Sequence, residues 1–274
     1  MGRADVITIL GIGLLAGFLI GSVGIGGVII VPALTYLMDI DIQFAIAAAL
    51  MGFILTGIVG TIQYERQGSI QWSSAWVLVA AAIPAALVGS LIVQMVSPLL
   101  LKCLIGGLAA VSGFQAIFAG ELVEGAPASA LSSGRLASAA AFTSFFSTAS
   151  GTGGPLLLVP ILMWLQQPLL GAIGLSQVIQ LPISIVATLS NLAMGTVNLY
   201  LGGLLAIALS VGCWFGASVA HKLPAKVLKI SVSCLLIWIG AAIFLDVAGK
   251  IYSSSDARPE GPVSLISSDA AYRV

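Results

Sequence analysis

Two glycine clusters are the residues whose type and spacing could do chemistry in this chain. They are Gly24-Ile25-Gly26-Gly27 and Gly151-Thr152-Gly153-Gly154. Each interrupts a long apolar run, and glycine is unfavourable inside a helix, so each cluster predicts a helix break. A helix that starts after such a break presents free N–H groups and the positive end of its dipole, which together favour an anion. The clusters therefore predict a pair of backbone anion sites.

Hydroxyl and amide side chains near the breaks extend this candidate substrate-binding site. Ser176, Gln180 and Ser184 recur every four residues and share one helical face. A polar stripe is costly against lipid, so we expect it to face protein or a cavity. Neutral donors suit an oxyanion that must bind and then leave. The predicted set is Gly24, Gly26, Gly27, Ser22, Ser150, Gly151, Thr152, Gly153, Gly154, Ser176, Gln177, Gln180 and Ser184.

A purely structural interpretation stands beside this one. Glycines also allow close helix packing in membranes, and a polar contact between helices there contributes about 0.6 kcal/mol. The chain lacks the residues that an intramembrane enzyme would need. The apolar spans have no paired carboxylates and no histidine, and the three cysteines (Cys103, Cys213 and Cys234) are far apart in the sequence. We predict no catalytic residue, no metal site and no cofactor.

The composition is that of a membrane protein. Hydrophobic residues make up 59% of the 274 residues and charged residues 7%, whereas a soluble domain carries roughly a quarter. No charged residue occurs from 136 through 220. The zero net charge gives no basic footprint for nucleic acid. The predicted fold is all-α and polytopic, integral to the inner or plasma membrane, with lipid and a small anion as partners.

The apolar runs fall into two similar series. We expect a first transmembrane repeat over 1–120, a linker over 121–135, a second repeat over 136–248 and a disordered tail over 249–274. Each repeat begins with a glycine-broken run and continues with three spans. The predicted runs are 6–38, 42–63, 72–96 and 99–119, then 136–166, 169–194, 199–220 and 227–247.

Several matches at one spacing indicate an internal repeat. Gly24 and Gly151 are 127 residues apart, as are Gly68 and Gly195 at the end of the following span. The prolines after the breaks, Pro32 and Pro160, are 128 apart, so the second copy is one residue longer.

The topology depends on the breaks. If each broken run is a hairpin, each repeat crosses the membrane three times and the halves are inverted; if each crosses fully, the halves are parallel. The hairpin arrangement places Arg66, Arg135, Lys222, Lys226 and Lys229 on one side and Arg3, Lys102 and Lys250 on the other, whereas full crossing gives four on each side and no bias. Cytoplasmic loops favour Lys and Arg, so we favour inverted halves with both termini outside.

The duplicated Gly-x-Gly-Gly…Val-Pro signature, at Gly24–Pro32 and Gly151–Pro160, resembles the sulfite exporter TauE/SafE family of membrane permeases. The likeness covers most of residues 10–248. It implies a carrier for sulfite, sulfonates such as sulfoacetate, or other small sulfur-containing anions, with the glycine turns as the anion site. One departure is Ala47-Ala48-Ala49 where the family often has hydroxyls, which implies that the second half supplies more of the polar site.

The sequence thus predicts a secondary transporter that works by alternating access. A passive anion channel and a non-transporting membrane assembly subunit remain the alternatives. Whether the protein forms a homodimer and whether transport is coupled to protons are left open. No span has an obvious Asp or Glu that could carry a proton, so any proton coupling would involve the ligand itself.

Overall fold

The helices account for every regular element in the described part of the chain. The computed structural model describes residues 3–24, 26–93, 95–97, 99–101, 103–107, 132–220, 222, 241 and 245. Five helices are long and apolar enough to cross a membrane, which confirms a polytopic all-helical membrane protein. These are α1 (Arg3–Val23), α3 (Ile42–Arg66), α4 (Trp72–Val93), α8 (Leu169–Ala193) and α9 (Leu199–Ala220). Three shorter helices are α2 (Gly27–Leu37), α6 (Ser133–Ser150) and α7 (Pro155–Trp164), and residues 99–101 and 103–107 are also helical.

The helix bounds follow local signals in the sequence. Asp41 caps α3, because its carboxylate accepts a hydrogen bond from the N–H of Gln43 at 2.9 Å. The helix α6 begins at Ser133, three residues inside the predicted linker, after Ser132 in an extended conformation. Most of the predicted spans 99–119 and 227–247, most of the linker and the whole tail lie outside the described residues.

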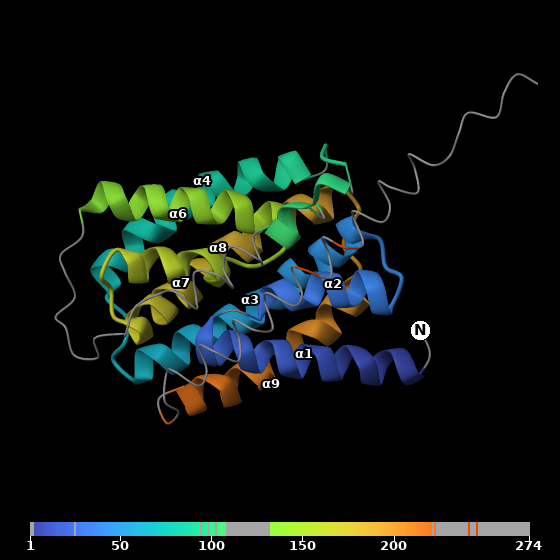
Figure 1. Cartoon of the computed structure of the whole chain (residues 1–274), viewed down its shortest axis with the longest axis horizontal. Coiled ribbons are helices and arrows are strands. Elements are labelled where there is room, and N and C mark those ends of the chain that lie inside the picture. The colour runs from blue at the N-terminus through green and yellow to red at the C-terminus, as the bar shows by residue number, and fades with distance from the viewer. Residues whose placement is uncertain are drawn as a thin grey trace, which may run out of the picture.

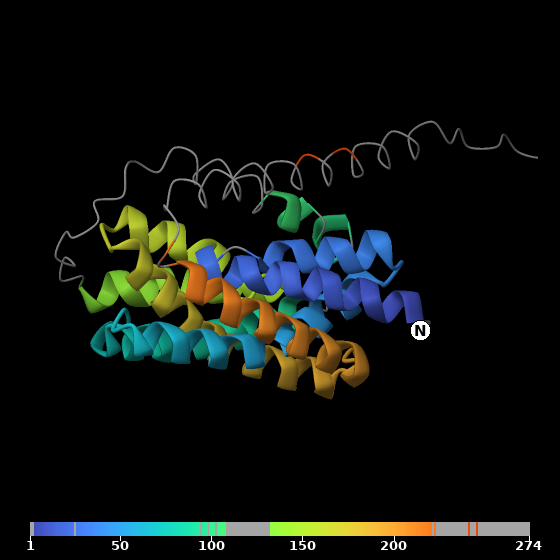
Figure 2. The same ribbon diagram turned by 90° about the horizontal axis from the view of Figure 1, so that it is seen from below.

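The helices are arranged in layers. Figure 1 shows α4 and α6 side by side at one edge of the bundle and α1 and α9 at the opposite edge, with α3, α8 and the short α2 and α7 between them. Figure 2, seen from below, shows α9 lying along α1. The middle layer therefore holds both glycine clusters.

Two hydrophobic cores divide these helices, and each core mixes the two halves of the sequence. The first core unites α1, α2 and α3 with α9 through residues such as Ile20, Phe53 and Leu209. The second unites α6, α7 and α8 with α4 through residues such as Leu78 and Ile179. The helix α4 thus packs with the later part of the chain and α9 with the earlier part.

The helices α3 and α8 run antiparallel where the two cores meet. A Cβ on Gly57 would lie 3.1 Å from the Leu181 side chain, and one on Gly60 would meet the Gln177 side chain. Further along, a Cβ on Gly174 would lie 3.4 Å from that of Tyr64. Rising numbers on α3 thus meet falling numbers on α8. Both helices have 25 residues, and α4 and α9 both have 22.

The edge pair α1 and α9 is joined by small residues. A Cβ on Gly17 would strike the carbonyl oxygen of Leu209, and one on Gly216 would strike that of Phe18. Such contacts bring two backbones as close as they can approach, which is the usual way helices associate in membranes. Because rising numbers meet rising numbers, these two helices are parallel.

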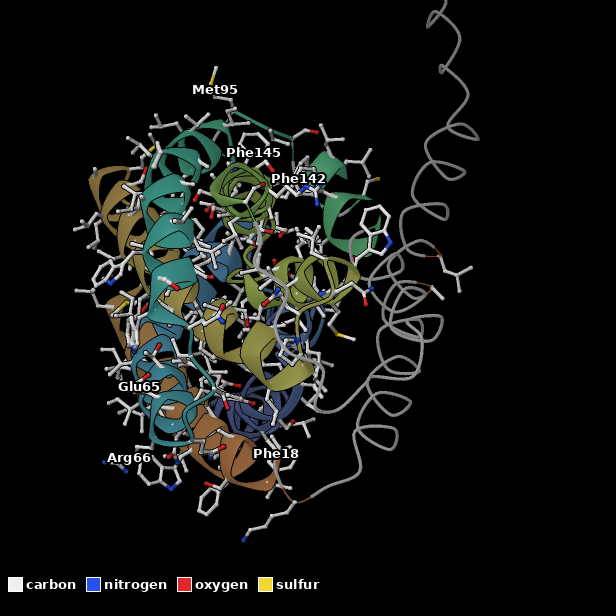
Figure 3. The ribbon with its side chains drawn as sticks, turned by 90° about the vertical axis from the view of Figure 1, so that its left-hand side faces the viewer. Phe18, Glu65, Arg66, Met95, Phe142 and Phe145 are labelled. Carbon is white, nitrogen blue, oxygen red and sulfur yellow. The ribbon has the colours of Figure 1, made fainter. Side chains whose placement is uncertain are left out.

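The charged residues lie at the helix ends, unequally. The end of α3, with Glu65 and Arg66, shares one end of the bundle with the end of α9, since Gln63 donates to Ser218 at 3.4 Å (Figure 3). The start of α6, whose first turn contains Arg135, lies at the same end (Figure 1). At the opposite end, where α2 passes into α3, the chain exposes Asp39 and Asp41.

Candidate functional site

Both glycine clusters break the helices as predicted. Gly24 and Gly151 follow α1 and α6 with φ of 77° and 69°, a left-handed conformation that glycine adopts at little cost. The next helices begin at Gly27, the last residue of the first cluster, and at Pro155, directly after the second cluster. Neither of these helix starts has a side-chain cap. We call residues 24–27 and 151–154 the paired breaks.

The paired breaks touch each other. A Cβ on Gly27 would strike the carbonyl oxygen of Thr152, so the two turns meet backbone to backbone. Each break also packs on the helix that follows the other. A Cβ on Gly24 would lie 3.0 Å from Val159, and one on Gly151 would lie 2.9 Å from Val31. The fold thus brings together two segments that are far apart in the sequence.

Close packing explains several of these glycines without a ligand. A Cβ on Gly26 would strike the carbonyl oxygen of Ala16, so the start of α2 is folded back against α1. A Cβ on Gly153 would lie 2.6 Å from the ring of Phe53. The packing interpretation therefore holds at Gly26, Gly27 and Gly153, whatever else these residues do.

Phe53 is the residue at the breaks that the sequence interpretation missed. Its side chain is fully buried on α3, and its ring lies against both breaks: Cδ2 faces Gly153, and Cζ is 3.1 Å from the position of a Cβ on Gly27. An isolated phenylalanine in an apolar span gives no local signal. The internal repeat does give a signal: at the 127-residue spacing of the breaks, Phe53 is the counterpart of Gln180, which belongs to the predicted site.

The polar stripe on α8 faces protein, as expected. Ser176, Gln177, Gln180 and Ser184 are each at most 1% exposed. The Gln180 side-chain amide donates to the carbonyl of Phe53 at 3.2 Å, and that of Gln177 donates to the carbonyl of Ile20 at 3.1 Å. The Ser176 hydroxyl donates to Ile173 within its own helix at 2.7 Å. The two amides therefore tie α8 to α3 and to the end of α1.

The hydroxyls beside the breaks form a second polar group. Ser150 donates to the carbonyl of Phe146 at 2.8 Å and lies 3.0 Å from the Thr152 hydroxyl. Thr148 donates to the carbonyl of Ser144 at 2.7 Å. In the first half, Ser22 donates to Leu19 over a longer 3.5 Å.

Other buried hydroxyls are left without a hydrogen-bond partner among the residues that the structure describes. The fully buried ones are Thr143, Ser144 and Ser147 on α6 and Ser184 on α8, and Thr35, Thr61 and Thr188 also have an unpaired hydroxyl. An unpaired buried hydroxyl carries a desolvation cost of about 1–3 kcal/mol, which a ligand or water would relieve. Of the four fully buried hydroxyls, Ser184 belongs to the predicted set, whereas Thr143, Ser144 and Ser147 do not, although Thr143 and Ser147 lie four residues apart on one face of α6.

The electrostatics of the paired breaks come from the backbone. Residues 6–38, 42–64 and 136–220 contain no charged side chain. Within the described residues, no group of three or more His, Cys, Asp or Glu could hold a metal ion. The N–H groups and dipoles of α2 and α7 are therefore the main fixed positive charge at this place.

Comparison with known proteins places the chain among membrane transporters. The family described as Sulfite exporter TauE/SafE matches residues 9–243. The chain is 26% identical to the probable membrane transporter protein YunE of Bacillus subtilis, over 86% of this chain and 96% of that protein. It is 27% identical to a probable membrane transporter protein of Haemophilus influenzae, over 85% of this chain and 96% of that protein. No solved structure matches the chain.

Proposed function

The chain belongs to the sulfite exporter TauE/SafE family of membrane transporters, a family of transporters and not of enzymes, and from this premise we propose that it carries small sulfur-containing anions by alternating access. Sulfite and organosulfonates such as sulfoacetate are the proposed substrates. The anion binds at the paired breaks, near the middle of the membrane, between the starts of α2 and α7.

One observation supports this site above the others: two uncapped helix starts meet among segments, residues 6–38, 42–64 and 136–220, that have no charged side chain. Their free N–H groups suit an oxyanion, and each dipole supplies roughly half a positive charge. Ser147 adds an independent reason to expect a ligand, because its buried hydroxyl has no partner among the described residues. Ser147 lies in the last turn of α6, and its carbonyl accepts from the N–H of Thr152 at 3.1 Å.

The remaining predicted residues take two roles in this proposal. The glycines bring the backbone close to the anion, while Ser22, Ser150, Thr152, Ser176 and Ser184 offer hydroxyls around it. Gln177 and Gln180 hold α1 and α3 in place through their amide donors, and the Gln177 carbonyl oxygen, which has no partner among the described residues, can orient a water. Neutral donors allow the anion to leave again.

An inverted repeat gives this site its two access states. The equal lengths of α3 and α8 and of α4 and α9, together with the 127-residue spacing, support a duplication. In an inverted repeat the two equivalent spans α3 and α8 must run in opposite directions, as they do here. Rocking of the two cores against each other along α3 and α8 would expose the breaks to one side and then to the other.

The charge distribution orients the molecule. Arg66, Arg135 and Lys222, with Glu65, mark the proposed cytoplasmic end, whereas the opposite end has Arg3 together with Asp5, Asp39 and Asp41. In this proposed orientation, the turn after α3 is inside and the turn after α8 is outside.

Transport by the purified full chain in proteoliposomes tests the proposal. We expect accumulation of labelled sulfite or sulfoacetate against a gradient and a raised melting temperature with these anions, with no shift for neutral analogues. Downhill flux alone would favour a channel of the same architecture. Absence of both flux and thermal shift for sulfite, sulfoacetate, thiosulfate and sulfate would leave the assembly-subunit alternative.

A further inference from the structure

The side chains around the paired breaks are unevenly distributed between α3 and α8. The three positions of the polar stripe on α8 and the adjacent Gln177 have counterparts 127 residues earlier on α3, and these four counterparts lack polar side chains. The pairs are Ser176 and Ala49, Gln177 and Leu50, Gln180 and Phe53, and Ser184 and Gly57. Any ligand between these helices meets amides and hydroxyls on one side and an apolar wall on the other.

Phe53 is the largest side chain of that apolar wall. It is fully buried, its ring contacts both breaks, and its backbone carbonyl is held by the Gln180 amide at 3.2 Å. The ring is therefore fixed at the point where the two helix starts meet. A benzene ring offers no hydrogen bond to an oxyanion, so its contribution there is volume and the exclusion of water.

We propose that Phe53 determines how large an apolar substituent the transported anion can carry. This inference rests on the proposed function, because it assumes that the anion binds at the paired breaks. The oxyanion group faces the N–H groups of the two helix starts and the unpaired hydroxyls of Ser147 and Ser184, and its substituent points towards the ring. A smaller side chain at position 53 leaves room for a bulkier substituent, while the groups that hold the oxyanion are unchanged.

The test is the selectivity of transport by the full chain in proteoliposomes. The rates for benzenesulfonate and for methanesulfonate are measured for wild type, Phe53→Leu and Phe53→Ala. We expect the ratio of the two rates to rise in that order, by roughly tenfold or more for Phe53→Ala, since a few methylene-sized groups in an apolar pocket change selectivity by that factor. Phe44→Ala is the matched control, because Phe44 lies on the same helix and is 43% exposed.

The outcomes separate this inference from the function on which it rests. If Phe53→Ala does not fold, Phe53→Leu decides alone, and its ratio must exceed that of wild type. A ratio equal to that of wild type in the folded Phe53 variants, or a rise of equal size in Phe44→Ala, overturns the role of Phe53 and leaves the transport of anions intact. A wild-type chain that moves no sulfonate and no sulfite overturns the proposed function and this inference with it.

Discussion

The Gln180 side chain donates a hydrogen bond to the backbone carbonyl of Phe53, which precedes it by 127 residues. Gly24 and Gly151 are separated by the same number of residues. Two positions at that spacing contact each other where α3 and α8 cross in opposite directions, close to the axis that would relate the two halves. The paired breaks lie at the same place, because the Phe53 ring touches both of them. The paired breaks therefore meet at the point where α3 and α8 cross.

Replacing Gln180 with Leu should impair transport more than stability. The variant loses one hydrogen bond between helices, worth about 0.6 kcal/mol, but it also releases the segment that carries Phe53. We expect the initial rate of anion uptake to fall roughly tenfold, while the melting temperature falls by about 2 °C. Gln63→Leu is the control, because it removes the bond to Ser218 between α3 and α9 near the end of the bundle. Equal initial rates of uptake in the two variants would show that transport does not depend specifically on the hydrogen bond between Gln180 and Phe53.

Replacing Gly153 with Ala should abolish transport and leave membrane insertion intact. The new Cβ requires an unfavourable backbone at φ 79° and meets the Phe53 ring, which must move. Gly195→Ala separates these two effects: its φ is 72°, but nothing lies within 4 Å of its Cβ position. We expect this control to lose a little stability and to transport normally. The comparison uses uptake normalised to the protein found in the membrane, and full activity of Gly153→Ala would contradict the prediction.

Replacing Ser147 with Ala should weaken anion binding without loss of stability. The hydroxyl has no partner among the described residues, so its removal relieves a desolvation cost in the empty protein. In the bound state the anion loses a donor, and we expect the KM for uptake to rise roughly tenfold. Ser90→Ala provides the contrast, because the Ser90 hydroxyl already donates to Leu87 at 2.8 Å. A lower melting temperature for Ser147→Ala together with an unchanged KM would assign Ser147 a structural role.

Labelling in intact cells should place the turns after α3 and α8 on opposite sides of the membrane. In a variant without native cysteines, we expect Gly195→Cys to react with a membrane-impermeant maleimide and Gly68→Cys to react after the membrane is permeabilised. These glycines lie in open turns, so a cysteine there makes no clash. Parallel halves would place both positions on the same side, and labelling of both in intact cells would refute the inverted arrangement.

The sequence was informative wherever hydropathy and glycine decide the structure. The predicted span 199–220 coincides with α9, and 169–194 differs from α8 by one residue, because polar residues and turns bound these apolar runs. The breaks were predictable since three glycines within four residues are costly in a helix, whereas the single pair Gly202-Gly203 lies within α9. Phe53 was not, because an apolar span contains many equivalent-looking residues and burial depends on neighbours from other helices. Nor could hydropathy indicate that α4 packs with α6 and α8, since lipid and protein partners favour the same residue types.

The exchange of α4 and α9 between the two cores has a consequence for biogenesis. The glycine-lined face of α1 enters the bilayer early, yet the helix that covers it begins at Leu199, so this face is exposed to lipid or to the insertion machinery for most of synthesis. Likewise α4 is inserted before either of its main neighbours exists. If the chain were cut between the two halves, one fragment would have α1 without α9 and the other would have α6 and α8 without α4. Neither fragment would then be a small transporter in its own right.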